Sequence, residues 1–358
     1  MKLSNILKKY WLQIFIYPLV LVILFFATCG MLNFILVPAN GTTILEDSLT
    51  AAQTAAGDID IAFLGASRTY RGIDAAHLST NLNQNIYNIS HENATYLTQY
   101  YLLKELCKTK KINSVYVEVS IANFVRVGED HNYFAYKVLT GEDKQTYAEA
   151  VHFEYDNNQI LEFKNHLKNF SNGRFWSTVT TRITKNTNPI FNEYGRAVAY
   201  GHGFYYAKRK ASNERKLQWF DSFYSAPLEN YCSESITYFF KILDFCQAND
   251  IAIKLYQTPF PLDIIKNYTA HLNEFDTWLQ AQTAQYNLEY YDFAKLKKER
   301  LALNNDYFYD FAHCNGEGAF VLRPNIESLL QAVSAGTYQA EDYFYPDFDA
   351  MVADYANN

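Results

Sequence analysis

The chain has 358 residues, of which 49% are hydrophobic and 17% aromatic, and its formal net charge at pH 7 is −7. This length and apolar content exclude a disordered chain and allow one large domain or two smaller ones, each with an ample core. The acidic balance, with no basic tract beyond the N-terminus, argues against nucleic acid as a partner.

Mostly apolar residues fill the range from residue 11 to 38, directly after Lys2, Lys8 and Lys9. This run of about 28 residues exceeds the ~20 that span a bilayer, and it is longer than the apolar part of a cleaved signal peptide. We therefore expect an uncleaved signal anchor in the cell membrane, a single-pass transmembrane helix. The lysines place residues 1–10 in the cytoplasm and the main domain outside it, after a linker over residues 39–57.

The first predicted strand covers residues 59–64 and ends abruptly in Gly65-Ala66-Ser67-Arg68. Open α/β sheets bind their ligands at the carboxyl ends of the strands. Ser67 stands at such an end, and it is therefore a candidate nucleophile. By itself a Gly-x-Ser turn is a weak motif, because a serine there is more often a helix cap.

Strand and helix patterns alternate over residues 58–335, which predicts a three-layer α/β/α fold with a parallel five-stranded sheet. The other predicted strands cover residues 86–90, 114–120, 251–256 and 288–291. Predicted helices cover residues 74–82, 94–107, 235–248, 271–286 and 316–333, with Asp74 and Asn315 as N-caps.

The alternation stops between residues 121 and 228, where aromatic residues and asparagines are frequent. A structureless loop of this length is improbable in a compact domain, so we expect a large, mostly helical insertion. Its aromatic residues are interpreted as packing residues, with stacking on sugar rings as the alternative. The acidic tail over residues 336–358 is expected to be a solvated, loosely held extension.

A second pair of reactive side chains, Asp310 and His313, precedes the last predicted helix. A serine hydroxyl needs a base to take its proton, and the base needs an orienting group. Residues three apart in a loop can act from one turn, and this loop should meet Ser67 at the carboxyl edge of the sheet. We therefore expect a catalytic triad of Ser67, His313 and Asp310.

These two motifs resemble those of the SGNH/GDSL hydrolase superfamily. Gly65-Ala66-Ser67-Arg68 is similar to its first block, with Ala66 where many members have aspartate, and Asp310-Phe311-Ala312-His313 to its last block. The membrane-anchored branch, with its D-alanyl-lipoteichoic-acid transfer proteins and polysaccharide O-acetyltransferases, looks most similar. The resemblance implies Ser67 as nucleophile, His313 as base and Asp310 as its orienting group.

The oxyanion hole departs from the family pattern, because the second-block glycine and the third-block Gly-x-Asn are both missing. Backbone amides at Ser67 and Arg68 are expected to contribute, and Asn93 is the candidate from the second block. Ser120 and Asn123 are candidate substrate-binding residues near the third block. Arg71 is a candidate for binding an anionic substrate, although a salt-bridged arginine fits equally well.

Two functions remain open from the sequence. The first is a membrane-anchored serine esterase or O-acyltransferase that acts on cell-envelope polysaccharide or another acylated glycopolymer, with a membrane acyl-delivery protein as a partner. The second is a non-catalytic glycan- or protein-binding envelope protein on a decayed hydrolase core. The five cysteines have no CxxC pair and no metal-ligand spacing, so no metal and no cofactor is expected.

Overall fold

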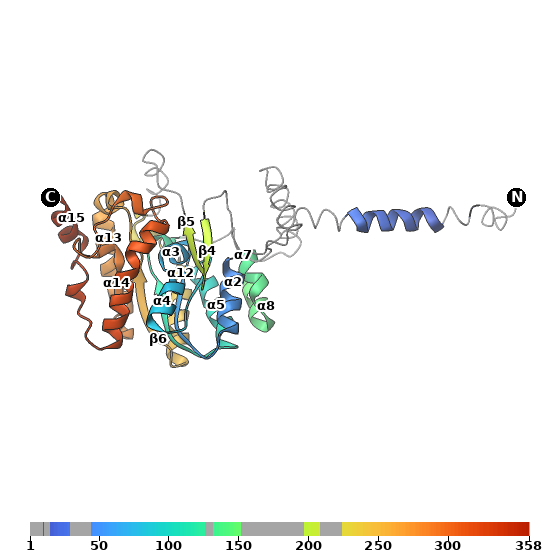
Figure 1. Ribbon diagram of the computed structural model, residues 1–358, viewed down its shortest axis with the longest axis horizontal. Coiled ribbons are helices and arrows are strands. Elements are labelled where there is room, and N and C mark those ends of the chain that lie inside the picture. The colour runs from blue at the N-terminus through green and yellow to red at the C-terminus, as the bar shows by residue number, and fades with distance from the viewer. Residues whose placement is uncertain are drawn as a thin grey trace. The chain divides into compact units, whose positions relative to one another are not determined.

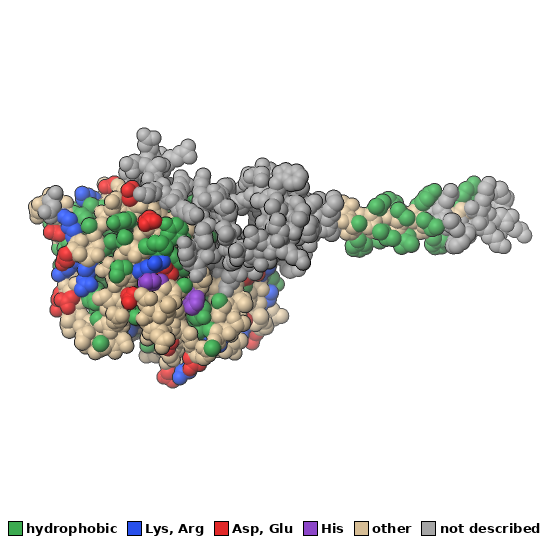
Figure 2. All heavy atoms as spheres, in the orientation of Figure 1, with side chains coloured by type: hydrophobic (Ala, Val, Ile, Leu, Met, Phe, Trp, Pro, Cys, Tyr) green, Lys and Arg blue, Asp and Glu red, His purple; other side chains and the backbone are tan. Residues whose placement is uncertain are grey.

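The computed structural model describes residues 10, 15–28, 44–125, 132–151, 197–207 and 224–357. The chain divides into a smaller unit, residues 1–41 and 154–189, and a larger unit, residues 42–153 and 190–358. In the smaller unit, residues 15–28 form a helix. Its side chains are apolar and exposed, with Phe15 at 65% and Phe26 at 67% exposure (Figure 2).

The predicted signal anchor over residues 11–38 falls only partly on this helix. Residues 11–14 and 29–38, and residues 1–9 before them, lie outside the described residues. Within the described ranges, no helix has both the length and the apolar character needed to cross a bilayer.

The larger unit is an α/β fold built on a parallel five-stranded sheet, which confirms the predicted core of the fold (Figure 1). The strand order is β2-β1-β3-β6-β7. The strands are β1 (Ile59–Gly65), β2 (Ile86–Ser90), β3 (Ile112–Glu118), β6 (Ala252–Gln257) and β7 (Glu289–Asp292). Strand β3 ends two residues before the predicted end, so Ser120 lies beyond the strand.

Helices cover this sheet in two groups. Helix α14 (Gly316–Ser334) contacts both α3 (Ser67–Gly72) and α4 (Ala75–Leu82), and Figure 1 shows the three helices in the same part of the fold. Helix α5 (Tyr96–Cys107) packs against α12 (Ser233–Ala248). Strand β1 lies between β2 and β3, so the strand order reverses its direction at β1. The carboxyl end of β1 is therefore a switch point, where α/β sheets bind ligands.

Short polar side chains begin several of these helices, as the sequence predicts. Asp74 accepts a hydrogen bond from the amide of His77 and caps α4. Asn315 accepts one from the amide of Gly318 and caps α14. Helix α13 (Leu262–Thr283) starts nine residues before its predicted start, directly after Pro261, because proline suits a helix entry and ends the preceding strand segment.

The described parts of the insertion contain helices and one hairpin. The helices are α6 (Ile121–Val125), α7 (Asn132–Val138) and α8 (Gly141–Ala150), and the hairpin consists of β4 (Ala197–Gly201) and β5 (Phe204–Ala207). The carbonyl of His202, in the hairpin turn, accepts from the amide of Asn88 at 2.9 Å. The hairpin thereby covers the open edge of β2, which an edge strand requires for protection.

The C-terminal segment is not the loosely held tail that its charge predicts. It contains α15 (Phe348–Ala356), which packs against α13, and both Phe348 and Met351 are fully buried. Helix α2 (Ile44–Thr54) at the other end of the unit packs against β2 in the same way. The acidic residues of the tail lie between apolar ones that face the core, so a count of charges alone gives the wrong expectation.

The remaining described elements of the larger unit are short 3₁₀ helices, η2 (Leu228–Asn230), η3 (Ala284–Tyr286), η4 (Phe293–Lys295), η5 (Asn305–Tyr307) and η6 (Ala340–Asp342).

Replacing Phe348 with alanine tests the packing of this segment. We expect Phe348→Ala to lower the free energy of unfolding by about 3–5 kcal/mol, because it removes a fully buried aromatic ring. Denaturant unfolding followed by circular dichroism measures the loss. Glu341→Ala, at an exposed position of the same segment, serves as control, and equal stability of the two variants would show that the segment contributes no packing.

Candidate active site

Ser67 is the first residue of α3, directly after the turn that ends β1. Ser67 is only 6% exposed, in keeping with its place at the carboxyl edge of the sheet. The preceding residue, Ala66, has extended backbone and no side chain that could cap the helix. The end of β1 therefore fixes the position of Ser67. Arg68 and Arg71 follow it on the helix that begins there.

Asp310 and His313 lie in the loop between η5 and α14, and one turn holds them together. Oδ1 of Asp310 accepts hydrogen bonds from the amide of Ala312 at 2.8 Å and from the amide of His313 at 2.9 Å. The amide of Tyr309 donates to the carbonyl of His313 at 2.8 Å. This local turn explains the spacing of three residues, because the carboxylate binds the backbone and the imidazole at the same time.

The structure brings the three predicted residues together in one hydrogen-bonded chain. Oγ of Ser67 lies 2.6 Å from Nε2 of His313. Nδ1 of His313 lies 2.9 Å from each carboxylate oxygen of Asp310. With Asp310 ionised, Nδ1 carries the proton and donates it, which leaves the lone pair of Nε2 to accept from the serine hydroxyl.

The charge on Asp310 is strongly favoured. Burial alone would raise the pKa of this carboxyl, but the nearby His313 and the amides of Ala312 and His313 outweigh burial and lower the pKa to about 2. Asp310 is therefore an anion at neutral pH. An anion at Nδ1 fixes the tautomer of His313 and stabilises the imidazolium that forms when the base takes a proton.

The amides of Ser67 and Arg68 are candidate oxyanion donors. The first amides of an α-helix have no acceptor within the helix, and these two residues open α3. The guanidinium of Arg68 points elsewhere: its Nη2 donates to the carbonyl of Thr258, and its Cζ lies 4.0 Å from the centre of the Phe260 ring. Arg68 is thus a candidate donor through its backbone only, while its side chain packs on Phe260 and lies 3.7 Å from Oε1 of Glu118.

Arg71 lies one turn after Ser67 and is only 6% exposed. Its guanidinium lies over the ring of Tyr309 at 4.5 Å, with Tyr70 at 5.5 Å and Tyr205 of β5 at 5.8 Å. Burial opposes its charge, but Tyr70, and to a lesser extent Glu92 and Asp310, outweigh burial and raise the pKa of Arg71 above its ordinary value. Arg71 therefore keeps its charge inside an aromatic enclosure beside the acid–base loop.

The other predicted residues take different places. Asn93 lies in the turn after β2, with left-handed backbone (φ 55°). Oγ of Ser120 donates to Oδ1 of Asn123 at 2.9 Å, and the side-chain Nδ2 of Asn123 donates to the carbonyl of Glu118. These bonds hold the side chains of Ser120 and Asn123 at the end of β3. Ser120 is fully buried and lies two residues after the end of β3.

Glu118, the last residue of β3, belongs to the surroundings of Ser67 although the sequence pattern does not single it out. It is fully buried, and its Oε2 accepts from the amide of Ala66 and from the hydroxyl of Thr69, both at 2.8 Å. One signal for it exists in the sequence, since it is the acidic residue at the end of an otherwise apolar run from Val115 to Val119.

Cys314, the residue after His313, carries a thiol that could in principle compete with Ser67 as nucleophile. Burial raises the pKa of its thiol to about 12, with Arg68 opposing this shift only in part. The thiolate is the reactive form of cysteine, so Cys314 is inert at neutral pH. No group of three His, Cys, Asp or Glu side chains in the described ranges is arranged to bind a metal ion.

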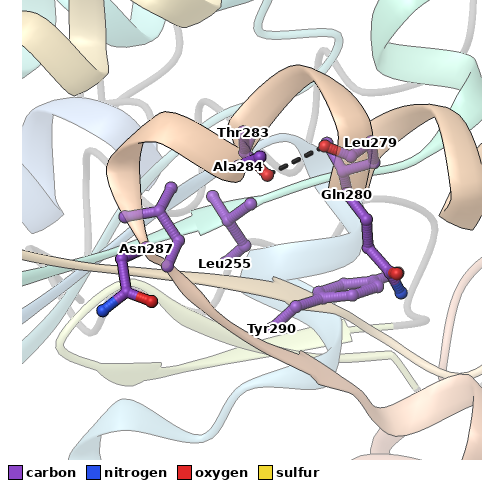
Figure 3. Close-up of a pocket in the computed structure, with 8 residues that line it drawn as sticks. Leu255, Leu279, Gln280, Thr283, Ala284, Asn287 and Tyr290 are labelled. Atoms are coloured by element: carbon purple, nitrogen blue, oxygen red, sulfur yellow. Dashed lines mark hydrogen bonds between the residues drawn. The ribbon is translucent and has the colours of Figure 1, made fainter.

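A cavity of about 230 Å³ lies away from the triad, between the end of α13 and strands β6 and β7 (Figure 3). Its lining contains no carboxylate, imidazole or thiol, and the hydroxyl of Thr283 is bonded to the carbonyl of Leu279. The cavity therefore offers no reactive group. Its lining residues are Leu255, Leu279, Gln280, Thr283, Ala284, Asn287, Leu288 and Tyr290.

Comparison with known proteins yields similarity at the level of structure. No protein-family model matches the sequence, and no curated protein matches it. The structure is similar to that of a proposed acylhydrolase from Bacteroides fragilis, with a TM-score of 0.40 and 11% identity over 82% of this chain and 96% of the other. It is also similar to a GDSL-like lipase from Bacteroides thetaiotaomicron, with a TM-score of 0.34 and 11% identity over 81% and 96%. At such distance the likeness does not identify a reaction, and the chemistry must be read from the side chains.

The low pKa of Asp310 links the site to stability at acid pH. A carboxyl whose pKa falls from 3.8 to about 2 on folding adds roughly 2 kcal/mol of stability above pH 4, which is lost as the pH falls from about 4 towards 2. We expect Asp310→Asn to be less stable than the wild type at pH 6 by about this amount. The difference should shrink below pH 4 in urea unfolding curves, and a constant difference from pH 6 to pH 3 would contradict the assignment.

Proposed function

We propose that this protein is a serine esterase or O-acyltransferase that works through an acyl-enzyme on Ser67. The chain of hydrogen bonds from Ser67 to His313 to Asp310 is the observation that supports this function. It contains a nucleophile, a base within 2.6 Å of it, and an anion that orients the base. Such an arrangement serves acyl transfer on unrelated folds, and it is recognised by its geometry.

In the first half of the reaction, Oγ of Ser67 attacks the carbonyl carbon of an ester while Nε2 of His313 takes the hydroxyl proton. The carbonyl oxygen becomes an oxyanion that the amides of Ser67 and Arg68 can stabilise. When the intermediate collapses, the bond to the alcohol breaks and His313 gives its proton to the leaving oxygen. The products are a free alcohol and an ester on Ser67.

In the second half, His313 takes a proton from an incoming hydroxyl, whose oxygen attacks the acyl-serine. Water as the acceptor gives a carboxylic acid, which is hydrolysis. A sugar hydroxyl gives a new ester, which is transfer. In both cases the proton returns to Oγ of Ser67, so the enzyme is regenerated and no cofactor is consumed.

For the substrate, we propose cell-envelope polysaccharide or a related acylated glycopolymer, with the chain anchored in the cell membrane. The basic N-terminus, the apolar run over residues 11–38 and the exposed apolar helix at residues 15–28 support an anchor. An anchor would keep Ser67 near the membrane, where a partner protein can supply acyl groups. This setting favours transfer over hydrolysis.

A non-catalytic binding protein is the second candidate function. The arrangement of Ser120 and Asn123 favours it, because both side chains are engaged locally and neither is a ready oxyanion donor. The hydrogen bond between Ser67 and His313 favours the enzyme, since a decayed site has no reason to keep a base on the serine. Covalent labelling of Ser67 separates the two functions.

Substitution of the triad is expected to abolish reaction with a fluorophosphonate probe and hydrolysis of p-nitrophenyl acetate. Ser67→Ala removes the nucleophile and His313→Ala the base, so both should reduce the rate to background. Asp310→Asn should reduce kcat by roughly 10⁴, since the wrong tautomer of His313 then predominates. Gel fluorescence and absorbance measure the two rates.

Ser328→Ala on α14 and His77→Ala on α4 are the matched controls, since Ser328 hydrogen-bonds to Tyr343 and His77 to Asn81, and neither partner belongs to the triad. Both should keep wild-type rates. Wild-type protein that the probe does not label at any concentration would contradict the enzyme and favour the binding protein. Labelling that persists in Ser67→Ala would place the nucleophile elsewhere.

The anchor predicts a specific cellular fraction. The full chain, produced in bacteria, is expected in the membrane fraction after a carbonate wash, because a spanning helix resists extraction that removes peripheral proteins. A chain that starts at residue 39 should appear in the soluble fraction with its fold retained, measured by circular dichroism. Recovery of the full chain in the carbonate supernatant would contradict the anchor.

A further inference from the structure

We propose that Glu118 is a positioning residue for the nucleophile, which holds the turn that carries Ser67 from a neighbouring strand. This inference rests on the proposed role of Ser67. Glu118 ends β3, the neighbour of β1, and its side chain is fully buried. Its side chain accepts hydrogen bonds from Ala66 and Thr69, on either side of Ser67, so its effect would be exerted through the backbone around Ser67.

The contacts of Glu118 lie on both sides of the nucleophile. Its Oε2 accepts from the amide of Ala66, the residue before Ser67, at 2.8 Å. The same oxygen accepts from the hydroxyl of Thr69, two residues after Ser67, also at 2.8 Å. One carboxylate oxygen therefore ties together the two ends of the turn from Ala66 to Thr69, and the backbone of Ser67 cannot shift relative to β3 without straining one of these bonds.

Further groups fix the carboxylate itself. The hydroxyl of Thr69 lies 2.6 Å from the hydroxyl of Tyr256, the residue on β6 paired with Glu118 in the sheet. Burial, and then the charge of Glu118, raises the pKa of Tyr256 well above its ordinary value, so Tyr256 remains a donor. The result is a directed chain in which Tyr256 donates to Thr69 and Thr69 donates to Glu118.

Gly65 leaves the space that this arrangement needs. A Cβ at residue 65 would lie 2.5 Å from Oε2 of Glu118 and would also overlap the hydroxyl of Thr69. The backbone of Gly65 has no positive φ, so its lack of a side chain serves the close approach of Glu118 and not an unusual conformation. The glycine of the Gly-x-Ser motif is thus explained by the carboxylate on the next strand.

A buried carboxylate is a costly way to hold the backbone where a helix begins. A serine or asparagine at residue 66 would cap α3 from its own side chain without placing a charge in the interior. Here Ala66 has no capping group, and the charge of Glu118 is offset by Nε of Arg68 at 3.7 Å from its Oε1. What the distant carboxylate adds is a link from the nucleophile turn to β3, so the sheet itself sets where Ser67 stands.

The chain contains a matched control in Glu105 on α5. Glu105 is 3% exposed, accepts from both the amide and the hydroxyl of Thr140 at 3.0 and 2.7 Å, and pairs with Lys108 at 2.7 Å. The set of partners, one amide, one threonine hydroxyl and one cation, matches that of Glu118. Glu105→Gln therefore reproduces the structural cost of the change away from Ser67.

The test measures the second-order rate of fluorophosphonate labelling of Ser67 in the full chain, corrected for the folded fraction of each variant. We expect Glu118→Gln to lower this rate by roughly 10-fold and Glu118→Ala by roughly 100-fold, since glutamine keeps one acceptor oxygen and a small misplacement of a reacting atom costs up to about 10². Glu105→Gln should keep the wild-type rate. In p-nitrophenyl acetate kinetics the loss should fall on the acylation rate constant and leave the apparent affinity for the ester unchanged.

Variants of Thr69 keep the test decisive if the Glu118 variants do not fold. Thr69→Val, which removes the hydroxyl and keeps the shape, should label several-fold more slowly, and Thr69→Ser should restore the wild-type rate. Equal labelling by Glu118→Gln and Glu105→Gln, or by Thr69→Val and Thr69→Ser, would overturn the positioning role. Labelling of the wild type that depends on Ser67 would still support the proposed enzymatic function. Absence of that wild-type labelling would overturn both.

Discussion

The hydrogen bond between Ser67 and His313 joins the first βα unit of the sheet to the loop before α14. The rest of the larger unit determines whether the two bonded atoms meet. Strand β1 sets the height of Ser67 at the carboxyl edge. The Asp310 turn sets the direction of the imidazole, and Asn315 fixes where α14 begins. Because a hydrogen bond tolerates only a few tenths of an ångström, this single contact constrains elements from both ends of the fold.

The sequence could predict the parts of this site that depend on local chemistry. Ser67 and His313 stand at ends of regular elements, where strand and helix patterns are easiest to read, and Asp310 is three residues from the base it orients. The parallel sheet follows from alternation in the same way. These predictions needed only period, spacing and the rule that parallel strands end at a common edge.

The sequence could not predict features that depend on which strands become neighbours. Glu118 matters because β3 lies beside β1, and strand order is not written in any local pattern. The hairpin that bonds to Asn88 lies in a region without periodicity, and its partner strand is more than a hundred residues away along the chain. The packing of the C-terminal segment is hidden from the sequence for a related reason. Phe348 and Met351 lie on α15, which packs against α13, and α13 is distant from them along the chain.

The distance along the chain between Ser67 and His313, 246 residues, also bears on when activity can arise during synthesis. A ribosome releases β1 and its serine long before the loop that carries the base, and contacts of such long range form late in folding. Until the loop before α14 docks, Ser67 has no imidazole beside it. If Ser67 is the nucleophile that we propose, the order of the elements delays its activation until the whole sheet has been synthesised.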